Sequence, residues 1–571
     1  MTTPSGRLEL TWTNKPLTLL AHDDGAYEWV SPADYRVAEV RLLHDAATVG
    51  HTAPAADRAR DNLLVRGDAL NALTSLARLP EFAAEYVGKV KLAYLDPPFN
   101  TQQSFLQYDD ALEHSVWLTM MRDRLAQVKT LLSPDGCVYL HCDSSEGHYI
   151  KVLMDELFDR SNFRSELIWK RTSAHSSANR YGPVHDTILF YTRSEQFVWN
   201  SQFEDYSERY LSEFYTHYDT DGRRWRRSDL TGAGTRTGAT GEVWRGLDVT
   251  SRGRHWAYPP SVLEEMDRDG KIHWPAKAGG MPMLKRYEDE QKGLPVQDVW
   301  TDIKPIHNLG TERSGFNTQK PETLLQRIIT ASTNKGDIVL DCFLGSGTTA
   351  AVAHKMDRRW VGVERSHRTA DTYIVPRLAR VVDGTDPGGI TGAQGWQGGG
   401  GFRVLDVAPS MFEAIEGGAV FLSDWATNGQ LAEVTAAQLG YPYERTPPFC
   451  GCRGRSSLAV VDGLVGEDVV RLLVDALDPD DLLVVCGTAV DPAALALARS
   501  LRPGSTVRKV PHSILAEYQQ GARWTQPALL PDAVPVHAER PETTDGVGEG
   551  PVPSRAAVRT GSVEADEVNV P

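Results

Sequence analysis

At 571 residues the chain is too long for one hydrophobic core, so we expect two to four domains. Its 41% hydrophobic and 24% charged residues are typical of a globular protein and exclude a fibrous or wholly disordered one. No stretch reaches the ~20 consecutive apolar residues of a membrane-spanning helix, and no secretory signal opens the chain. We therefore expect a cytoplasmic protein without a membrane partner. The net charge of -16, taken alone, argues against nucleic acid as a partner.

The six cysteines fit neither a disulfide framework nor the paired spacing of a zinc site. Cys450 and Cys452 form the single close pair, and we interpret them as structural. The sequence therefore predicts no bound metal.

A rhythm of strands and helices begins at residue 61, after a polar segment, 1–60, that predicts a small wrapping element. Apolar runs predict strands at 63–65, 90–95, 137–141 and 187–191, and amphipathic patterns predict helices at 117–132 and 149–158. Alternating strands and helices are typical of an α/β fold with a parallel, Rossmann-like sheet. Residues 61–194 are expected to form its first half.

The rhythm stops over residues 195–310, where Gly, Arg, Trp, Tyr and Pro dominate, and this indicates an inserted module. It resumes over 311–383, with helices at 322–332 and 350–356 and strands at 338–341 and 360–364. Glycines at 384–401 predict a flexible linker. Residues 402–525 predict a small C-terminal α/β domain, and residues 526–571 a disordered acidic tail.

A glycine turn follows the strand that ends in Asp341 and opens into the next helix. It contains Phe343, Gly345, Gly347, Thr348 and Thr349. Its glycines let the backbone approach a ligand, and a helix N-terminus favours electron-rich groups. Glu364 ends the next strand, where an acid can bind the two hydroxyls of a ribose. These residues predict a site for an adenosine-containing cofactor, either S-adenosylmethionine or a dinucleotide.

A proline turn, Asp96-Pro97-Pro98-Phe99, follows the strand 90–95 at the end where open α/β sheets bind ligands. Its two prolines lack N–H donors, so the turn presents carbonyls and a carboxylate as hydrogen-bond acceptors. Such acceptors pull an exocyclic amine towards a tetrahedral, more nucleophilic form. Phe99 can stack on a base that has left the double helix. The alternative is a Pro-Pro turn with an Asp that only caps a helix.

An arginine island lies between residues 222 and 260, with eight arginines against three carboxylates. Trp225, Trp244 and Trp256 are interleaved with the arginines. A basic segment in an acidic chain indicates a surface for a polyanion, and a solvated face of stacked Arg and Trp is the alternative. The arginines are Arg223, Arg224, Arg226, Arg227, Arg236, Arg245, Arg252 and Arg254.

Taken together, the two turns resemble those of the amino-methylating DNA methyltransferases, in the circularly permuted arrangement in which the catalytic turn precedes the cofactor turn. The resemblance covers roughly residues 61–370 and extends the proline turn to Asn100 and Thr101. It also includes the segment 318–322, Thr-Gln-Lys-Pro-Glu, and the pair Gly67-Asp68. The motif order and the opening of the chain are most similar to the modification subunits of type III restriction-modification systems and related phage-defence methylases.

The resemblance implies a Rossmann-like methyltransferase sheet that binds S-adenosylmethionine and methylates double-stranded DNA. It makes 61–194 the catalytic half, 195–310 the target-recognition module and 311–383 the cofactor half. Asp68 is expected near the cofactor's adenine, and Gln319 and Lys320 at its methionine end. Asp rather than Ser at position 96 implies adenine as the target base. The predicted DNA contacts are Arg223, Arg224, Arg226, Arg227, Arg236, Arg252 and Arg254.

Other functions remain to be weighed against this one. Methylation of cytosine at ring carbon 5 needs a Pro-Cys nucleophile, which the chain lacks. A methylase of the cytosine amine, of RNA or of glutamine could use a similar turn, although the last two usually carry Asn where Asp96 stands. A nicotinamide dehydrogenase would leave the proline turn without a role, and a non-catalytic DNA-binding subunit would not need intact motifs. A restriction or helicase partner and a homodimer stay open.

Overall fold

The computed structural model describes residues 9–21, 27–99, 103–104, 109–110, 113–173, 181–277, 280–307, 310–414 and 419–525. The described residues up to Ala522 form one compact unit. The predicted tail 526–571 lies outside the described residues, as do Asn100 and Thr101 of the extended proline turn.

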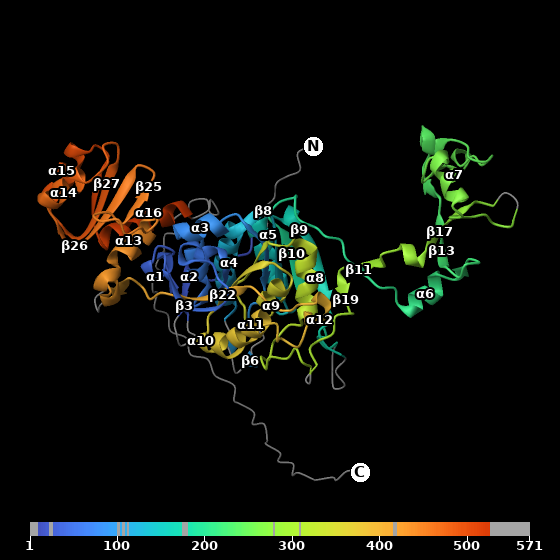
Figure 1. The fold of residues 1–571 in the computed structure, drawn as a ribbon, viewed down its shortest axis with the longest axis horizontal. Helices are drawn as coiled ribbons and strands as arrows, with labels where there is room; N and C mark the ends of the chain where they lie inside the picture. Colours follow the sequence, from blue (N-terminus) through green and yellow to red (C-terminus); the bar gives the residue numbers. More distant parts are fainter. Residues whose placement is uncertain are drawn as a thin grey trace, which may run out of the picture. The chain divides into compact units, whose positions relative to one another are not determined.

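A ten-stranded sheet organises the chain (Figure 1). The strands from β8 to β22 run parallel to one another, whereas β10 is antiparallel to both of its neighbours. Strand β20 pairs directly with β5, although the inserted module separates the two strands in the sequence. This strand order is consistent with the permuted arrangement, in which the proline turn precedes the glycine turn. In spatial order the strands are β19 (Val299–Trp300), β9 (Phe163–Trp169), β10 (Asp186–Thr192), β8 (Leu132–Cys142), β5 (Val90–Leu95), β20 (Ile338–Asp341), β21 (Arg359–Glu364), β4 (Asn62–Arg66), β22 (Gly401–Val407) and β3 (Leu43–Gly50).

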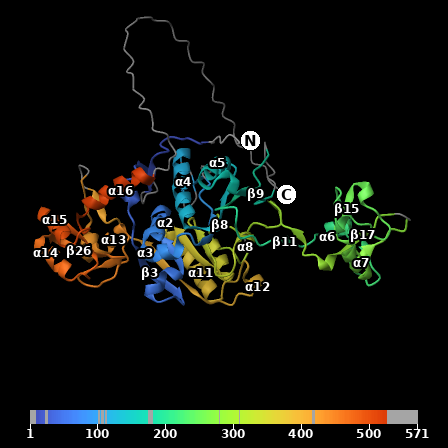
Figure 2. The ribbon, with the colours of Figure 1, turned by 90° about the horizontal axis from the view of Figure 1, so that it is seen from above.

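Helices cover both faces of this sheet, as expected for parallel strands that are apolar along their length. In β5, Ala93 and Leu95 pack with one layer of helices, and Leu92 and Tyr94 pack with the other. Figure 2 shows α4 and α5 on one side of the sheet and α8 and α11 on the other. The first layer contains α2 (Ala69–Arg78), α3 (Pro80–Tyr86), α4 (His114–Leu131) and α5 (Gly147–Phe158), and the second contains α8 (Glu322–Ser332), α9 (Thr348–Lys355) and α11 (Val375–Val382).

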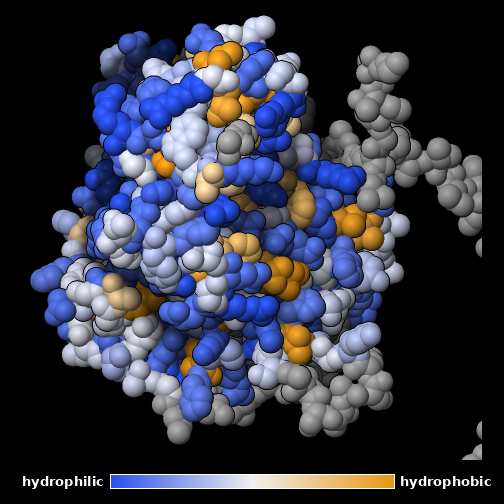
Figure 3. Space-filling model, turned by 90° about the vertical axis from the view of Figure 1, so that its right-hand side faces the viewer, coloured by the Kyte–Doolittle hydropathy of each residue, from blue (hydrophilic) through white to orange (hydrophobic). Residues whose placement is uncertain are grey.

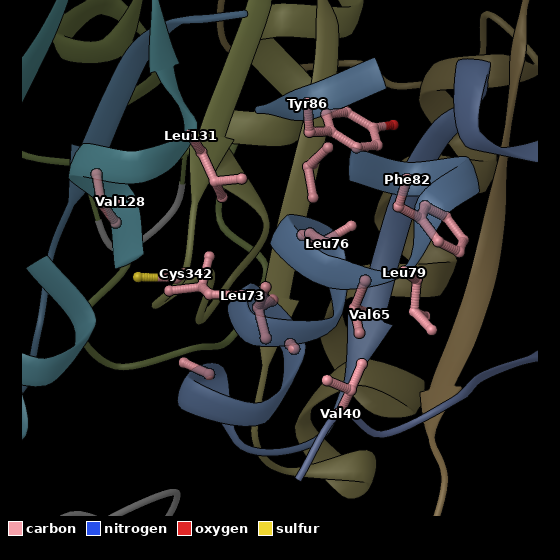
Figure 4. Packing of buried hydrophobic residues seen from close by; sticks show 14 of the residues in the cluster. Val40, Val65, Leu73, Leu76, Leu79, Phe82, Tyr86, Val128, Leu131 and Cys342 are labelled. Atoms are coloured by element: carbon pink, nitrogen blue, oxygen red, sulfur yellow. The ribbon is translucent and has the colours of Figure 1, made fainter. Parts of the chain in front are cut away.

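The first layer is held by large apolar side chains at helical spacing. Leu73 and Leu76 of α2 point towards Val65 of β4 and are fully buried. Figure 4 shows them beside Phe82 and Tyr86 of α3. Burying side chains of this size contributes roughly 1.5–3 kcal/mol each, so this layer fixes α2 against the sheet.

Part of the predicted wrapping segment belongs to the sheet itself. Strand β3 pairs antiparallel with β22 and forms one edge of the ten strands. Ahead of it, β1 (Thr18–Ala21) and β2 (Tyr27–Val30) form a hairpin. The indole of Trp12 donates a hydrogen bond of 2.7 Å to the Thr119 hydroxyl on α4. The stretch before β3 thus lies over α4, and residues 55–60 after β3 pack against α3, where Arg58 lies over the Phe82 ring.

The predicted flexible linker over 384–401 is wrong, because this segment is packed against helix α8. Ile390 is buried, and its N–H donates to Glu322 Oε2 at 2.9 Å. A Cβ at Gly389 would lie 2.0 Å from that same oxygen. The glycines thus permit close packing, and the segment continues directly into β22.

The inserted module has its own small sheets and its own core. Its paired ends are β11 (Phe203–Glu204) and β18 (Leu294–Pro295), whereas the flanking β19 joins the large sheet. The module is therefore shorter than the predicted 195–310. Its core contains Trp244, Trp256 and Leu263. The main elements are α6 (Glu208–Phe214), β12 (His217–Tyr218), β13 (Arg224–Asp229), β14 (Thr231–Ala233), β15 (Arg254–Trp256), α7 (Pro260–Arg268), β16 (Ile272–His273) and β17 (Met283–Tyr287).

A four-stranded sheet with helices follows β22, as the apolar runs of the C-terminal region predict. Strands β26, β27 and β28 run parallel, and β25 is antiparallel to β26. Leu483 and Val485 are buried against Ala494 and Ala498 of α15. The elements are α13 (Leu431–Leu439), β25 (Gly451–Arg453), β26 (Ser456–Val465), α14 (Glu467–Asp475), β27 (Leu482–Val490), α15 (Pro492–Leu501), β28 (Thr506–Lys509) and α16 (His512–Thr525).

Within the described ranges, no helix is both long enough and apolar enough to cross a membrane. Figure 3 shows one face of the molecule, on which hydrophilic residues dominate and hydrophobic residues form small separate groups.

A buried cluster of four charged side chains joins α8, α9, α11 and the loop after α11. Lys355 Nζ lies 2.8 Å from Glu322 Oε2 and 2.5 Å from Asp386 Oδ2, and Arg377 lies 2.8 Å from Glu322 Oε1. Arg377 also donates 2.9 Å to the Thr348 hydroxyl, within the glycine turn. Two cations thus neutralise two anions away from water, which makes the cluster intolerant of losing one member.

We predict that Lys355→Met destabilises the fold by about 3–5 kcal/mol, because it leaves two buried carboxylates without their shared cation. Urea denaturation followed by circular dichroism measures the change. Lys335→Met is the control, because Lys335 pairs with Asp357 at the surface and exposed pairs contribute little. Equal stability of the two variants would contradict a structural role for the cluster.

Candidate active site

The proline turn and the glycine turn lie side by side at one edge of the sheet. They follow β5 and β20, which are parallel neighbours, so both begin where these two strands end. Helices leave the sheet in opposite directions at this point, and such a switch point is where open α/β sheets bind ligands. A cleft of about 1860 Å³ lies here, lined by both turns, by residues 316–321 and by Asp68 and Glu364.

The glycine turn is shaped by its two glycines. Gly345 and Gly347 adopt φ angles of 53° and 78°, in the left-handed region that side chains disfavour. A Cβ at Gly347 would also lie 3.2 Å from Ile374 Cγ2. Helix α9 begins at the next residue, so its N–H groups face the cleft end of the turn.

Glu364 ties the glycine turn to the end of β21. Its Oε2 accepts a hydrogen bond of 3.0 Å from the Gly345 N–H, and its Oε1 accepts one of 2.9 Å from the Ser366 N–H. Burial raises the pKa of this carboxyl to about 7, and the two N–H donors only partly offset that rise. The carboxyl still lines the cleft, where it can accept further hydrogen bonds.

Asp341, the last residue of β20, stabilises the glycine turn through hydrogen bonds. Its carboxylate accepts hydrogen bonds from the Phe343 N–H at 2.9 Å and from the Thr349 hydroxyl at 2.6 Å. Burial raises its pKa to about 7 as well. The side chains of Asp341 and Thr349 therefore hold the turn in shape, and Phe343 lines the cleft.

The proline turn is fixed by a hydrogen bond from α4. The indole of Trp117 donates 2.7 Å to the Pro98 carbonyl, so this carbonyl is already engaged. Within the part of the chain that the structure describes, the Pro97 carbonyl has no hydrogen-bond donor. The Pro97 carbonyl is therefore an acceptor of this turn that remains open to a ligand.

Lys320 lies directly on the proline turn. Its Nζ is 2.7 Å from Asp96 Oδ1, 2.5 Å from Asp96 Oδ2 and 4.9 Å from the centre of the Phe99 ring. The sequence predicts Lys320 at a cofactor carboxylate, and the structure places it against the Asp96 carboxylate of the proline turn instead.

Behind Asp96 lies a buried polar network that sequence reasoning missed. His141 Nδ1 is 2.7 Å from the Tyr94 hydroxyl and 4.0 Å from Asp96, and Nε2 is 3.2 Å from Asp186 Oδ2. Burial raises the pKa of Asp186, but the hydrogen bond to His141 and nearby positive charges outweigh it, so the pKa lies below its usual range. These residues lie at the ends of strands β5, β8 and β10. Their position at strand ends next to the proline turn is the feature of the sequence from which the network could have been predicted.

Two predicted cofactor residues are engaged in local structure. Asp68 caps α2 by accepting 2.8 Å from the Leu70 N–H, and it forms a 2.7 Å ion pair with buried Arg124. The Gln319 amide binds its own loop, accepting from the Ser314 N–H at 2.7 Å. Both residues line the cleft, so the structure brings them to the site, but with part of their hydrogen-bonding capacity already used.

The arginine island lies outside the cleft, in the inserted module, and its members differ in their partners. Arg223 pairs with Asp289 and Glu290, and the exposed ends of β13 and β17 are joined through it. Other members are also engaged: Arg224 with the Tyr215 carbonyl, Arg226 over the Tyr215 ring, Arg245 with Glu264 and Asp267, and Arg254 with Thr231. Arg227, Arg236 and Arg252 are exposed, and their side chains have no ion pair or hydrogen bond with any described residue.

Among the described residues, no group of three or more His, Cys, Asp or Glu side chains could hold a metal ion. The cleft is lined by carboxylates, carbonyls and backbone N–H groups together with cations that include Lys320, Arg124 and Arg171.

One known protein family matches a stretch of this chain that contains both turns. The family model N6_N4_Mtase, described as DNA methylase, matches residues 90–374, which includes the proline turn, the inserted module and the glycine turn.

Curated relatives match over about half of this chain. Type II methyltransferase M.EcaI of Enterobacter cloacae is 34% identical over 294 residues, which cover 50% of this chain and 64% of that protein. The probable type III restriction-modification enzyme HindVI Mod subunit of Haemophilus influenzae is 33% identical over 417 residues, covering 61% and 54%. The chain thus spans between half and two thirds of the length of these relatives.

Solved structures that match the chain include PvuII DNA methyltransferase (cytosine-N4-specific), which is 15% identical with a TM-score of 0.30, and the match covers 57% of this chain and 86% of that one. The M1.HpyAVI–SAM complex is 16% identical with a TM-score of 0.29, covering 54% and 96%. The family match spans both turns and the strands that carry them, and the chain belongs to the N6_N4 family of DNA methylases.

Proposed function

We propose that the protein is a site-specific DNA methyltransferase that transfers a methyl group from S-adenosylmethionine to the exocyclic amine of adenine, in a restriction-modification or phage-defence system. The observation that carries the proposal is the common cleft of Asp96 and the glycine turn, on neighbouring strands of a DNA methylase fold. A methyl donor and an amine acceptor must meet within a few ångströms, and this cleft is where the two turns meet.

The residues of the glycine turn fit the adenosine part of the cofactor. Glu364 can accept hydrogen bonds from the two ribose hydroxyls, because its carboxyl faces the cleft beside Gly345. Gly345, left-handed and without a side chain, lines the cleft and leaves room for the ligand next to the backbone, whereas Gly347 permits close packing against Ile374. When bound, S-adenosylmethionine supplies an electrophilic methyl group on a positively charged sulfur.

The proline turn fits an aromatic amine. Asp96 and the Pro97 carbonyl accept the two amine hydrogens, which concentrates the nitrogen lone pair on the side that faces the methyl group. Phe99 offers a ring on which the flipped base can stack. As positive charge develops on the amine nitrogen, the Asp96 carboxylate stabilises it. An aspartate at this position supports adenine as the base, and the cytosine amine is the alternative that a base analysis distinguishes.

The inserted module is proposed to read double-stranded DNA. Its three exposed, unengaged arginines are the ones able to bind phosphates or base edges, since the engaged members would first have to leave their partners. The sequence predicts DNA contacts for seven arginines without distinguishing among them. We now restrict the proposed DNA contacts to Arg227, Arg236 and Arg252, and leave out Arg223, Arg224, Arg226 and Arg254. Because relatives are named as Mod subunits of restriction-modification enzymes, we propose a restriction subunit as a partner.

We predict that DNA from cells producing the protein carries N6-methyladenine at one sequence context, and that Asp96→Asn abolishes this mark. The amide keeps the size of the carboxylate but cannot stabilise positive charge on the amine. Sequencing with modified-base detection gives base and context together. Asp135→Asn is the control, because Asp135 pairs with Lys91 at the opposite end of β8. Methylcytosine in place of methyladenine would assign the cytosine amine, and methylation by Asp96→Asn at the parental rate would contradict the role of Asp96.

We predict that S-adenosylmethionine binds more tightly as the pH rises from 6 to 8. Burial raises the pKa of Glu364 to about 7, and ribose hydroxyls donate to its ionised form, so at lower pH binding must first remove a proton. Glu364→Gln should bind more weakly at pH 8 and lose this dependence. Titration calorimetry at several pH values measures both effects. Since Asp341 titrates in the same range, the difference between parent and variant is the decisive quantity. An identical pH dependence in the two proteins would remove Glu364 from the ribose site.

We predict that replacing Arg227 and Arg236 together by Ala weakens DNA binding and lowers its salt dependence, by a slope of about 0.9 for each DNA phosphate that the variant no longer neutralises. The matched control replaces Arg223 and Arg245, which changes the net charge equally but breaks ion pairs and ring contacts within the module. DNA affinity measured against salt concentration separates the two pairs. Equal weakening in both pairs would show that total charge, rather than these two arginines, governs binding.

A further inference from the structure

Lys320 contacts both the Asp96 carboxylate and the Phe99 ring, the two groups of the proline turn that a target base would use. Its ammonium is within 2.7 Å of both Asp96 oxygens and lies over the Phe99 ring. The Lys320 side chain is only 10% exposed, so water does not weaken this pair as it would at a surface. A lysine in this position competes with the base for both the acceptor and the stacking face.

The competition is also electrostatic. Transfer of a methyl group places positive charge on the amine nitrogen, and a free carboxylate at Asp96 stabilises that charge. An ammonium bound to the same carboxylate neutralises it and adds repulsion. With Lys320 in its present place, the turn is therefore poorly suited to the reaction proposed for it.

The backbone of Lys320 is joined to the glycine turn. The Thr348 hydroxyl donates 3.3 Å to the Lys320 carbonyl, at the start of α9. The Lys320 side chain thus starts from a backbone that borders the glycine turn, while its ammonium contacts the proline turn, so one residue links the two turns. Other ionisable groups near Asp96 include buried His141 at 4.0 Å, Asp186 beyond it, and buried Asp341, whose pKa the Asp96 carboxylate helps to raise.

We infer that Lys320 exchanges between two carboxylates: that of Asp96 in the free protein and that of the methionine moiety when S-adenosylmethionine is bound. This inference rests on the proposed function. Cofactor binding then frees Asp96 for the base, and the protein captures its target base only after it holds a methyl donor. The two sites are coupled through one side chain, and the coupling is reciprocal.

Reciprocity gives a test that needs no DNA. If Asp96 holds Lys320 away from the cofactor, Asp96→Asn should tighten the binding of S-adenosylhomocysteine, by about fivefold or more for a typical coupling. Methylthioadenosine contains the same adenosine and thioether but no amino-acid carboxylate. Its affinity should not change in Asp96→Asn, because it cannot use the released lysine.

The experiment is a calorimetric cycle on the full chain with four proteins: parent, Asp96→Asn, Lys320→Met and the double variant. Lys320→Met should weaken S-adenosylhomocysteine binding, and Asp96→Asn should then have no further effect. Tighter binding by Asp96→Asn in the Lys320→Met background would overturn the inference, because loss of negative charge alone would explain it. Unchanged or weaker binding by Asp96→Asn in the parent background would also overturn it.

The cycle separates this inference from the proposed function. If the parent binds S-adenosylhomocysteine but Asp96 has no effect on it, the exchange of Lys320 fails and the cofactor site stands. If the folded parent binds neither ligand, the cofactor site and the inference fail together. Asp135→Asn again serves as the control for the loss of one negative charge elsewhere.

Discussion

The pairing of β5 with β20 is the constraint on which the rest of the site depends. Leu92 pairs with Val339 and Ala93 with Leu340, so two segments far apart in the chain end at the same height in the sheet. Each strand is buried between layers of helices, and hydrophobic burial therefore fixes the register. A shift by one residue would turn apolar side chains to the wrong layer and separate the two turns, so the chemistry of the cleft depends on the packing of the core.

The second support is electrostatic and lies beneath the glycine turn. The Glu322 carboxylate binds Lys355 of α9, Arg377 of α11 and the Ile390 N–H of the following loop. Segments that approach the cofactor side from three directions thus share one buried acid. Such an arrangement specifies a single geometry, because any displacement leaves a charge unpaired away from water.

Local patterns predicted the strands and helices that carry the site, because those elements are long, apolar and periodic. Helix α8 and strands β5 and β20 have the bounds expected from sequence. What could not be predicted depends on distant partners. The glycines before β22 are typical of a flexible linker, and the sequence does not show that Glu322 packs against Gly389. Composition likewise could not show that Arg223 is neutralised by Asp289, or that Lys320 lies on Asp96.

Because β20 follows β5 only after the inserted module in the sequence, the central part of the sheet cannot form until late in synthesis on the ribosome. Strands β4 and β5 emerge early, but in the finished sheet β20 and β21 lie between them. Until those two strands leave the exit tunnel, β5 has one unpaired apolar edge and β4 has none of its final neighbours. The inserted module has to be translated during this interval. A nascent chain with such open edges is prone to pair with other chains, and this risk lasts until β20 and β21 have been translated and have filled the gap between β5 and β4.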